Sequence, residues 1–243
     1  MAMATEDTSI DQALRERLES IFTTTLDSIT LYGSYVRGTW RRGSSDINVL
    51  ILLTEPAPEL IRQFGTSARG FLTRERITPL ILTRREFITS ADVFPMEYAD
   101  IVDAHRTIAG TDPTGELDLQ NHNLRHQLEH QLRGTLVALR QMNLASRGRR
   151  RALRRELLEW FGPLAAVFRG LIRLAGESKI PGETEEMIRT VGRLYDLDTT
   201  PFITLLKLRD DRGADTLELS DHLDRRLSEL AQKVDFLRGD RGE

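Results

Sequence analysis

The chain has 243 residues, with 34 basic and 37 acidic side chains, a net charge of -3, 40% hydrophobic residues and no cysteine. This length and apolar content exclude a disordered chain, and the missing cysteines exclude disulfides, thiolate nucleophiles and cysteine-based zinc sites. The balanced charge gives no general attraction to nucleic acid, and no run is apolar enough to cross a membrane. Because the first residues also lack a signal peptide, we expect a cytoplasmic protein with neither nucleic acid nor a membrane as its partner.

The first part of the chain alternates between helical and strand patterns. Apolar residues at helical spacing predict helices over residues 9–26, 59–72 and 95–106. Alternating and β-branched residues predict strands over residues 28–32, 46–53 and 77–83. The middle strand is apolar almost throughout, which is typical of a central strand covered on both faces.

The second part of the chain shows helical spacing only. The apolar stripes predict five helices, over residues 119–142, 152–175, 183–195, 200–209 and 220–237. A polar turn, Gly110-Thr-Asp-Pro113, separates the two parts. The pattern therefore predicts an α+β protein in which an α/β domain, residues 1–113, is followed by a helical bundle domain, residues 114–243.

Residues 31–53, LYGSYVRGTWRRGSSDINVLILL, carry the strongest chemical signal. A predicted strand ends in Gly33-Ser34, where glycine lets a phosphate approach the backbone and the start of a helix offers amide donors. After a polar turn the next strand opens with Asp46 and Asn48, which lie two residues apart and so point to the same face, back toward Gly33 and Ser34. The segment predicts a phosphate-binding corner opposite a metal-binding carboxylate.

This segment resembles the nucleotidyltransferase superfamily of the DNA polymerase β type, and within it the aminoglycoside adenylyltransferases and the minimal nucleotidyltransferases. The resemblance rests on the G-S-x-x-x-G run at Gly33 and on the S-D-I-x-V-L-I-L strand, with eleven residues between Ser34 and Asp46. It covers residues 28–113 and implies a nucleotidyltransferase-type mixed sheet with helices, ahead of the bundle. It implies that the nucleotide is bound by Gly33, Ser34, Arg37 and Gly38, and that the catalytic and metal-binding residues are Asp46 and Asn48.

The family transfers a nucleoside monophosphate from a nucleoside triphosphate to a hydroxyl group, with two Mg²⁺ ions held by three carboxylates. This sequence departs from that pattern twice: the second acid is Asn48, and the strand expected to carry the third acid has none, although Glu75 and Glu86 flank it. Losing two of three protein charges should cost several kcal/mol of metal affinity. We expect at most one weakly bound Mg²⁺, escorted by the nucleotide to Asp46 with the help of Asn48.

Two functions follow from these expectations. The first is a nucleotidyltransferase with impaired activity, which uses a small molecule or a protein as its acceptor and takes its acceptor pocket from the bundle. The alternative is a catalytically inactive pseudoenzyme that binds a nucleotide or a partner. The sequence leaves the presence of enzymatic activity open.

Three further groups of polar residues have an ordinary and a functional interpretation. The two acids Glu97 and Asp100 favour an acidic first helical turn over a substitute carboxylate or general base. The three histidines on one helix face, at positions 122, 126 and 130, favour a solvated face over a metal site. The six arginines within residues 147–155 favour a solvated turn over a grip on a polyanion, since no aromatic residue accompanies them.

Overall fold

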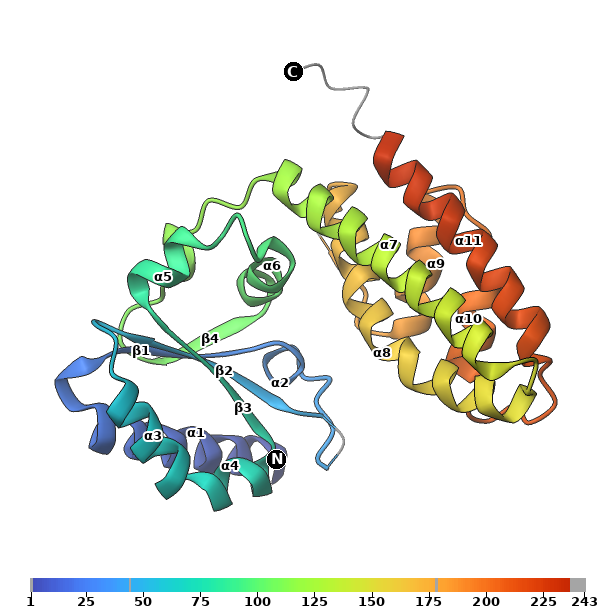
Figure 1. Ribbon diagram of the computed structural model, residues 1–243. Coiled ribbons are helices and arrows are strands. Elements are labelled where there is room, and N and C mark those ends of the chain that lie inside the picture. Colours follow the sequence, from blue (N-terminus) through green and yellow to red (C-terminus); the bar gives the residue numbers. More distant parts are fainter. Residues whose placement is uncertain (1, 44, 178, 237–243) are drawn as a thin grey trace. The chain divides into compact units, whose positions relative to one another are not determined.

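The computed structural model of the protein describes residues 2–43, 45–177 and 179–236. The chain forms two compact units, Met1–Leu119 and Gln120–Glu243, so the division lies just after the predicted polar turn (Figure 1). The first unit contains the sheet, and all the elements described in the second unit are helices. The predicted α+β class is confirmed.

Four strands form the sheet of the first unit: β1 (Leu26–Tyr32), β2 (Ile47–Leu53), β3 (Ile77–Thr83) and β4 (His105–Ala109). Their order is β3-β2-β1-β4, and only the β2–β3 pair is parallel. The three predicted strands are present. The strand β4 was not predicted, because the helix expected over residues 95–106 ends at Asp103 and the chain then turns back to pair with β1.

Helices cover both faces of this sheet (Figure 1). One face packs on α1 (Ala2–Phe22), α3 (Pro58–Ser67) and α4 (Arg69–Glu75). The other face packs on α5 (Arg84–Thr89) and α6 (Pro95–Asp103). Successive side chains of a strand point to opposite faces, so β2 sends Val49 and Ile51 to the first core and Leu50 and Leu52 to the second.

Three helical details differ from the sequence prediction. The helix expected over residues 59–72 is two helices, α3 and α4, which meet at Ala68. Helix α5 was missed, although Thr83 and Glu86 form a reciprocal capping box at its start. The helix after Gly33, α2 (Ser34–Arg37), is a single turn. Two 3-10 turns, η1 (Thr23–Thr25) and η2 (Thr114–Glu116), complete the first unit.

The second unit is a bundle of five described helices that match the five predicted segments, with shifted ends. They are α7 (Asn121–Ser146), α8 (Arg150–Leu174), α9 (Thr184–Leu194), α10 (Thr200–Lys207) and α11 (Thr216–Phe236). Residue 237, the predicted end of the last helix, lies outside the described residues. Helices α7 and α8 approach closely at Gly170, where an added Cβ would lie 2.7 Å from Leu128 Cδ2. None of the described helices is long and apolar enough to span a membrane.

Candidate functional site

One end of the sheet gathers the residues that the sequence singled out. The antiparallel pairing places Tyr32, the last residue of β1, opposite both Asn48 of β2 and His105 of β4. The parallel pairing places Asn48 beside Thr78 of β3. The end of β1 and the starts of β2, β3 and β4 therefore meet at one edge, which carries Asn48 and adjoins Gly33, Asp46 and Arg76.

The segment Gly33–Gly38, which we call the corner, turns the chain out of β1. Gly33 has φ +80° and ψ -144°, a conformation that is costly for any residue with a side chain, and its N–H donates to Ala104 O at 3.0 Å. A Cβ at this position would lie 3.1 Å from Nδ2 of Asn48, so the glycine backbone and the asparagine amide face each other directly. Gly38, at φ +75°, ends α2 in the left-handed region.

The corner is held by backbone bonds. The carbonyl of Ser34 accepts from the amides of both Thr39 and Trp40, at 3.1 Å each. Because α2 is one turn long, it contributes much less dipole than a longer helix would. The amides of Gly33, Arg37 and Gly38 are already bonded, so the donors that the corner can offer a phosphate are the amides of Ser34, Tyr35 and Val36 and the serine hydroxyl.

Trp40 stabilises the conformation of the corner. Its ring packs edge-on against Tyr35, with the centroids 5.5 Å apart, and its Nε1–H donates to Ser45 O at 2.9 Å. Ser45 N–H in turn donates to Arg41 O at 2.9 Å, which closes the polar turn before β2. This arrangement agrees with a packing role for the tryptophan rather than with stacking on a nucleotide base.

Asp46 lies immediately before β2 and is paired with Arg76. Nε and Nη2 of Arg76 lie 2.9 and 2.8 Å from the same carboxylate oxygen, Oδ1. The backbones are also joined, because Ile47 N–H donates to Arg76 O at 2.9 Å. The parallel register explains this contact: Ile47 pairs with Ile77, so the residues that precede the two strands become neighbours.

The third acid of the family pattern has no counterpart at this edge. The position beside Asn48 on β3 is Thr78. Glu75 pairs with Arg74 at 2.6 Å, and Glu86 accepts from Thr83 N–H at 2.7 Å inside the capping box. These bonds from Thr83 hold the pKa of Glu86 below its usual value. Both glutamates that flank the strand are therefore bound elsewhere.

These residues do not fit a two-metal site. Hard cations such as Mg²⁺ need several oxygen ligands with negative charge. The positions of the family pattern, Asp46, Asn48 and Thr78, offer one carboxylate, which already holds a guanidinium, and one amide. Among the side chains that the structure describes, no group of three His, Cys, Asp or Glu residues could hold a metal ion. The metal-ligand roles expected for Asp46 and Asn48 stay predictions.

Helix α6 brings two acids to the same edge. Burial raises the pKa of the Tyr32 hydroxyl, and the nearby charges of Asp100 and Glu97 raise it further. Arg37 reaches from the corner to Asp100, with Nη2 3.7 Å from its carboxylate and 3.3 Å from its backbone carbonyl. The sequence favours an acidic first helical turn for these acids, and the structure also places them beside β1 and the corner.

The histidine face of α7 does not form a metal site in the described structure. His122, His126 and His130 are exposed, and His126 contacts the guanidinium of Arg125, with 3.1 Å between Nε2 and Nη2. Arg125 is buried and lies 3.5 Å from Glu129. The contacts agree with a solvated helix face.

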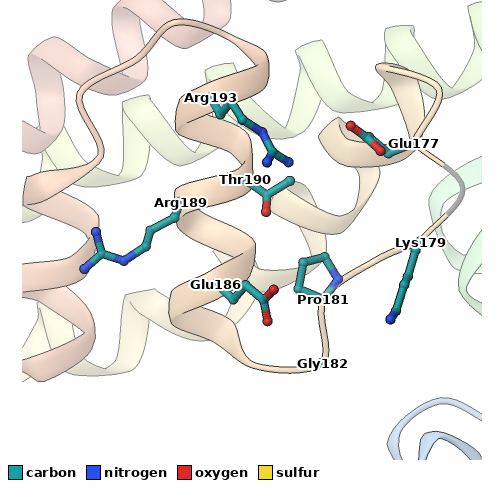
Figure 2. A pocket seen from close by; sticks show the side chains of 8 residues that line it. All are labelled: Glu177, Lys179, Pro181, Gly182, Glu186, Arg189, Thr190 and Arg193. Atoms are coloured by element: carbon teal, nitrogen blue, oxygen red, sulfur yellow. The ribbon is translucent and has the colours of Figure 1, made fainter.

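Two hollows lie in the second unit. The first, about 600 Å³, lies beside α9 and is lined by Glu177, Lys179, Pro181, Gly182, Glu186, Arg189, Thr190 and Arg193 (Figure 2). Its charges are mixed, and Arg189 turns away toward Glu185, with 2.7 Å between Nη2 and Oε1. The second is open and about 730 Å³ in size, and it lies at the arginine-rich start of α8. There Arg150 pairs with Asp215 at 2.8 Å, and Arg154 donates to Asp211 O at 2.8 Å.

A comparison with protein families bears on the first unit. Residues 12–108 match the family model described as the nucleotidyltransferase domain. Most of the first unit is therefore similar to this family. The match begins in α1 and ends in β4, so it includes the corner, Asp46, Asn48 and Arg76 but not the bundle.

Comparisons with individual proteins add less. No curated protein matches the chain by sequence. A crystal structure of the spectinomycin adenyltransferase AAD(9) from Enterococcus faecialis, determined with ATP and spectinomycin, aligns over 92% of this chain and 99% of that chain. The sequence identity is 11% and the TM-score is 0.45, which is too low to carry the site or substrates of that enzyme over to this chain.

Arg76 and Tyr32 are the site residues that sequence reasoning missed. The signal for Arg76 was present, because a helical connection between two adjacent strands makes them parallel. The residues before the two strands then become neighbours. Tyr32 could be found only from the packing of α6 over the end of β1, which the sequence pattern does not reveal.

Proposed function

We propose that the nucleotidyltransferase domain binds a nucleoside triphosphate at the corner and transfers a nucleoside monophosphate from it to a hydroxyl group of a small molecule or protein. The altered acid set reduces its activity. The observation that carries the proposal is the approach of Gly33 to Asn48, where an added Cβ would lie 3.1 Å from the asparagine amide. The Gly33 N–H is bound to Ala104 O, so the donors proposed for a phosphate are the amides that follow it at the start of α2 and the Ser34 hydroxyl.

Each residue of the corner makes a different contact with the phosphates. Gly33 lets a phosphate oxygen approach the main chain, and Ser34 adds a hydroxyl donor next to it. Arg37 contributes a positive charge that Asp100 orients. These groups favour the triphosphate of the nucleotide and leave the identity of its base open.

A second candidate function is nucleotide binding without transfer. The observation that favours it is the pair between Arg76 and Asp46, at 2.8 Å, because it places a guanidinium on the carboxylate that the family uses for metal. A domain of this kind senses a nucleotide or presents a nucleotide-dependent surface to a partner. The two candidates share the binding step and differ in whether pyrophosphate is released.

The test measures binding and chemistry separately on the full chain. ATP and GTP binding is measured by isothermal titration calorimetry, and pyrophosphate release is followed with Mg²⁺ and a panel of hydroxyl acceptors. Binding with acceptor-dependent pyrophosphate supports transfer, whereas binding without pyrophosphate for any acceptor supports the second candidate. A chain that binds neither nucleotide, with or without Mg²⁺, contradicts both.

A further inference from the structure

We propose that Arg76 supplies, in place of a divalent metal ion, the positive charge that meets the triphosphate, so that nucleotide binding by this chain does not require a metal. The inference rests on the nucleotide binding proposed above and adds the means by which the charge of the phosphates is balanced. It follows from the poor fit of this edge to a metal site.

The backbone fixes Arg76 beside the position where the family holds metal. Arg76 O accepts from Ile47 N–H at 2.9 Å, and its side chain reaches Asp46 with both Nε and Nη2. The residue ends α4 at φ +53°, in the left-handed region that non-glycine residues rarely adopt. The backbone of Arg76 is therefore held beside the start of β2 by the fold, and its guanidinium by the ion pair alone.

Arg76 lies on the same face of the sheet as the corner. Asp46 and Asn48 are two residues apart at the start of an extended strand, so their side chains leave the same face. The Asn48 amide lies against Gly33, and the guanidinium lies on Asp46. A phosphate chain that starts at the glycine and passes the asparagine next meets the arginine.

The ion pair of Arg76 is suited to exchange. Its side chain is 45% exposed and that of Asp46 is 50% exposed, and pairs in such surroundings contribute little to folding. A guanidinium binds phosphate through paired, charge-assisted hydrogen bonds, which a single carboxylate oxygen does not provide. We infer that Arg76 turns from Asp46 to the triphosphate when the nucleotide binds.

Arg37, an arginine of the corner, is held more firmly than Arg76. Arg37 contacts both the carboxylate and the backbone carbonyl of Asp100, and its side chain is 25% exposed. It can support the bound nucleotide from its present position but is less able to move. Of these two arginines, Arg76 is the one that is better able to change partner.

The experiment compares ATP binding in EDTA and in Mg²⁺ for the full chain and its variants. For the wild type we expect dissociation constants within about threefold of each other in the two conditions. Arg76→Asn removes the charge while keeping a residue that tolerates the left-handed conformation, and it should weaken ATP binding in EDTA by about tenfold or more. The matched control is Arg74→Asn, an exposed arginine two residues earlier that pairs with Glu75, and it should bind ATP like the wild type.

A second variant, Asp46→Asn, distinguishes a positive charge supplied by Arg76 from one supplied by a metal ion at Asp46, because the two predict changes in ATP affinity of opposite sign. Asp46→Asn releases Arg76 from its partner, so ATP binding in EDTA should become tighter, whereas removing a metal ligand would weaken binding in Mg²⁺. Asp46 is exposed, so this variant tests the inference even if Arg76→Asn is unstable. Wild-type binding that requires Mg²⁺, or an Arg76→Asn variant that matches its control, overturns the inference while nucleotide binding stands. A wild-type chain that binds no ATP in either condition rejects the proposed function itself.

Discussion

Two arginine–aspartate pairs lie at opposite ends of the same sheet and differ in what surrounds them. At the start of β1, Arg84 pairs with Asp27 at 2.7 Å, and the two side chains are 23% and 24% exposed. Arg84 also bonds Glu116 and Thr111 O, which ties the chain after β4 to the sheet. At the other end, the pair of Arg76 with Asp46 is about half exposed. The same two residue types therefore stabilise the fold at one end and leave charge available at the other.

Two glycines repeat this contrast. Gly110 has φ +73°, and a Cβ there would lie 2.0 Å from Asp27 O, inside packed backbone. Gly33 has φ +80°, but its Cβ would meet only the amide end of Asn48 at 3.1 Å. A side chain at Gly110 would clash with the main chain, whereas a side chain at Gly33 would contact only the Asn48 amide in front of the corner.

The largest expected effect is a loss of stability at the end of the sheet where Arg84 pairs with Asp27, which we call the structural end. Gly110→Ala forces a side chain into Asp27 O and also strains φ, so the free energy of unfolding should fall by about 3 kcal/mol or more. Urea unfolding followed by circular dichroism measures this loss. Gly176→Ala, at φ +84° with open space around it, is the control for backbone strain alone and should lose about 1–2 kcal/mol. Equal losses in the two variants would contradict the close approach at Gly110.

The second prediction concerns the corner. Gly33→Ala places a methyl group in front of Asn48 and should weaken ATP binding by about tenfold, or 1.4 kcal/mol. The measurement is calorimetric titration at a temperature where the variant is folded. Gly176→Ala, at another positive-φ glycine in the other unit, should leave ATP binding unchanged. Unaltered binding by Gly33→Ala would remove the corner from the site.

The third prediction separates the two ion pairs. Arg84→Gln removes charge-assisted bonds to Asp27 and Glu116 and should lower the free energy of unfolding by about 1–2 kcal/mol. Arg76→Gln, with its exposed partner, should lower it by less than about 1 kcal/mol. Chemical denaturation of both variants under one condition provides the comparison. A larger loss for Arg76→Gln would mean that the exposed pair is the structural one.

The fourth prediction asks whether the edge can be returned to a metal site. Asn48→Asp adds a second carboxylate two residues from Asp46 and should raise the affinity for Mn²⁺ by about threefold to tenfold. Electron paramagnetic resonance of Mn²⁺ without nucleotide measures the affinity directly. Asn121→Asp, on the exposed start of α7, controls for added charge. No difference between the two variants would mean that residue 48 does not face the metal position.

Much of the fold could be predicted from patterns within single segments. The central strand β2 and the five bundle helices follow from apolar spacing, and the domain type follows from the Gly33 and Asp46 segment. The strand β4 could not be found in this way, because its five residues follow α6 without a turn signal and are only partly buried. Their strand character comes from pairing with β1.

The site was less predictable because it depends on register. Gly33 and Asn48 belong to one continuous motif, and their approach follows from a strand that folds back on its neighbour. The partners Arg76 and Thr78 come from β3 and the residue before it. A shift of two residues in the pairing of β2 with β3 would replace them with different side chains. The acids of α6 reach Tyr32 through helix packing, for which the sequence carries no equivalent spacing rule.

The smallest expected effect is the pH dependence of the capping box at the structural end. Bonds from the backbone and hydroxyl of Thr83 lower the pKa of Glu86 from 4.5, so its stabilising contribution is present above that pH and is lost as the pH falls through the folded value. Glu86→Gln removes the charge at every pH. The difference in unfolding free energy between wild type and variant should therefore be constant between pH 7 and 5.5 and should shrink below about pH 4.5. Glu55→Gln, an exposed glutamate between β2 and α3, is the control. Urea unfolding at successive pH values gives the curve, and a difference that stays constant into acid would mean that Thr83 does not stabilise the charged form of Glu86.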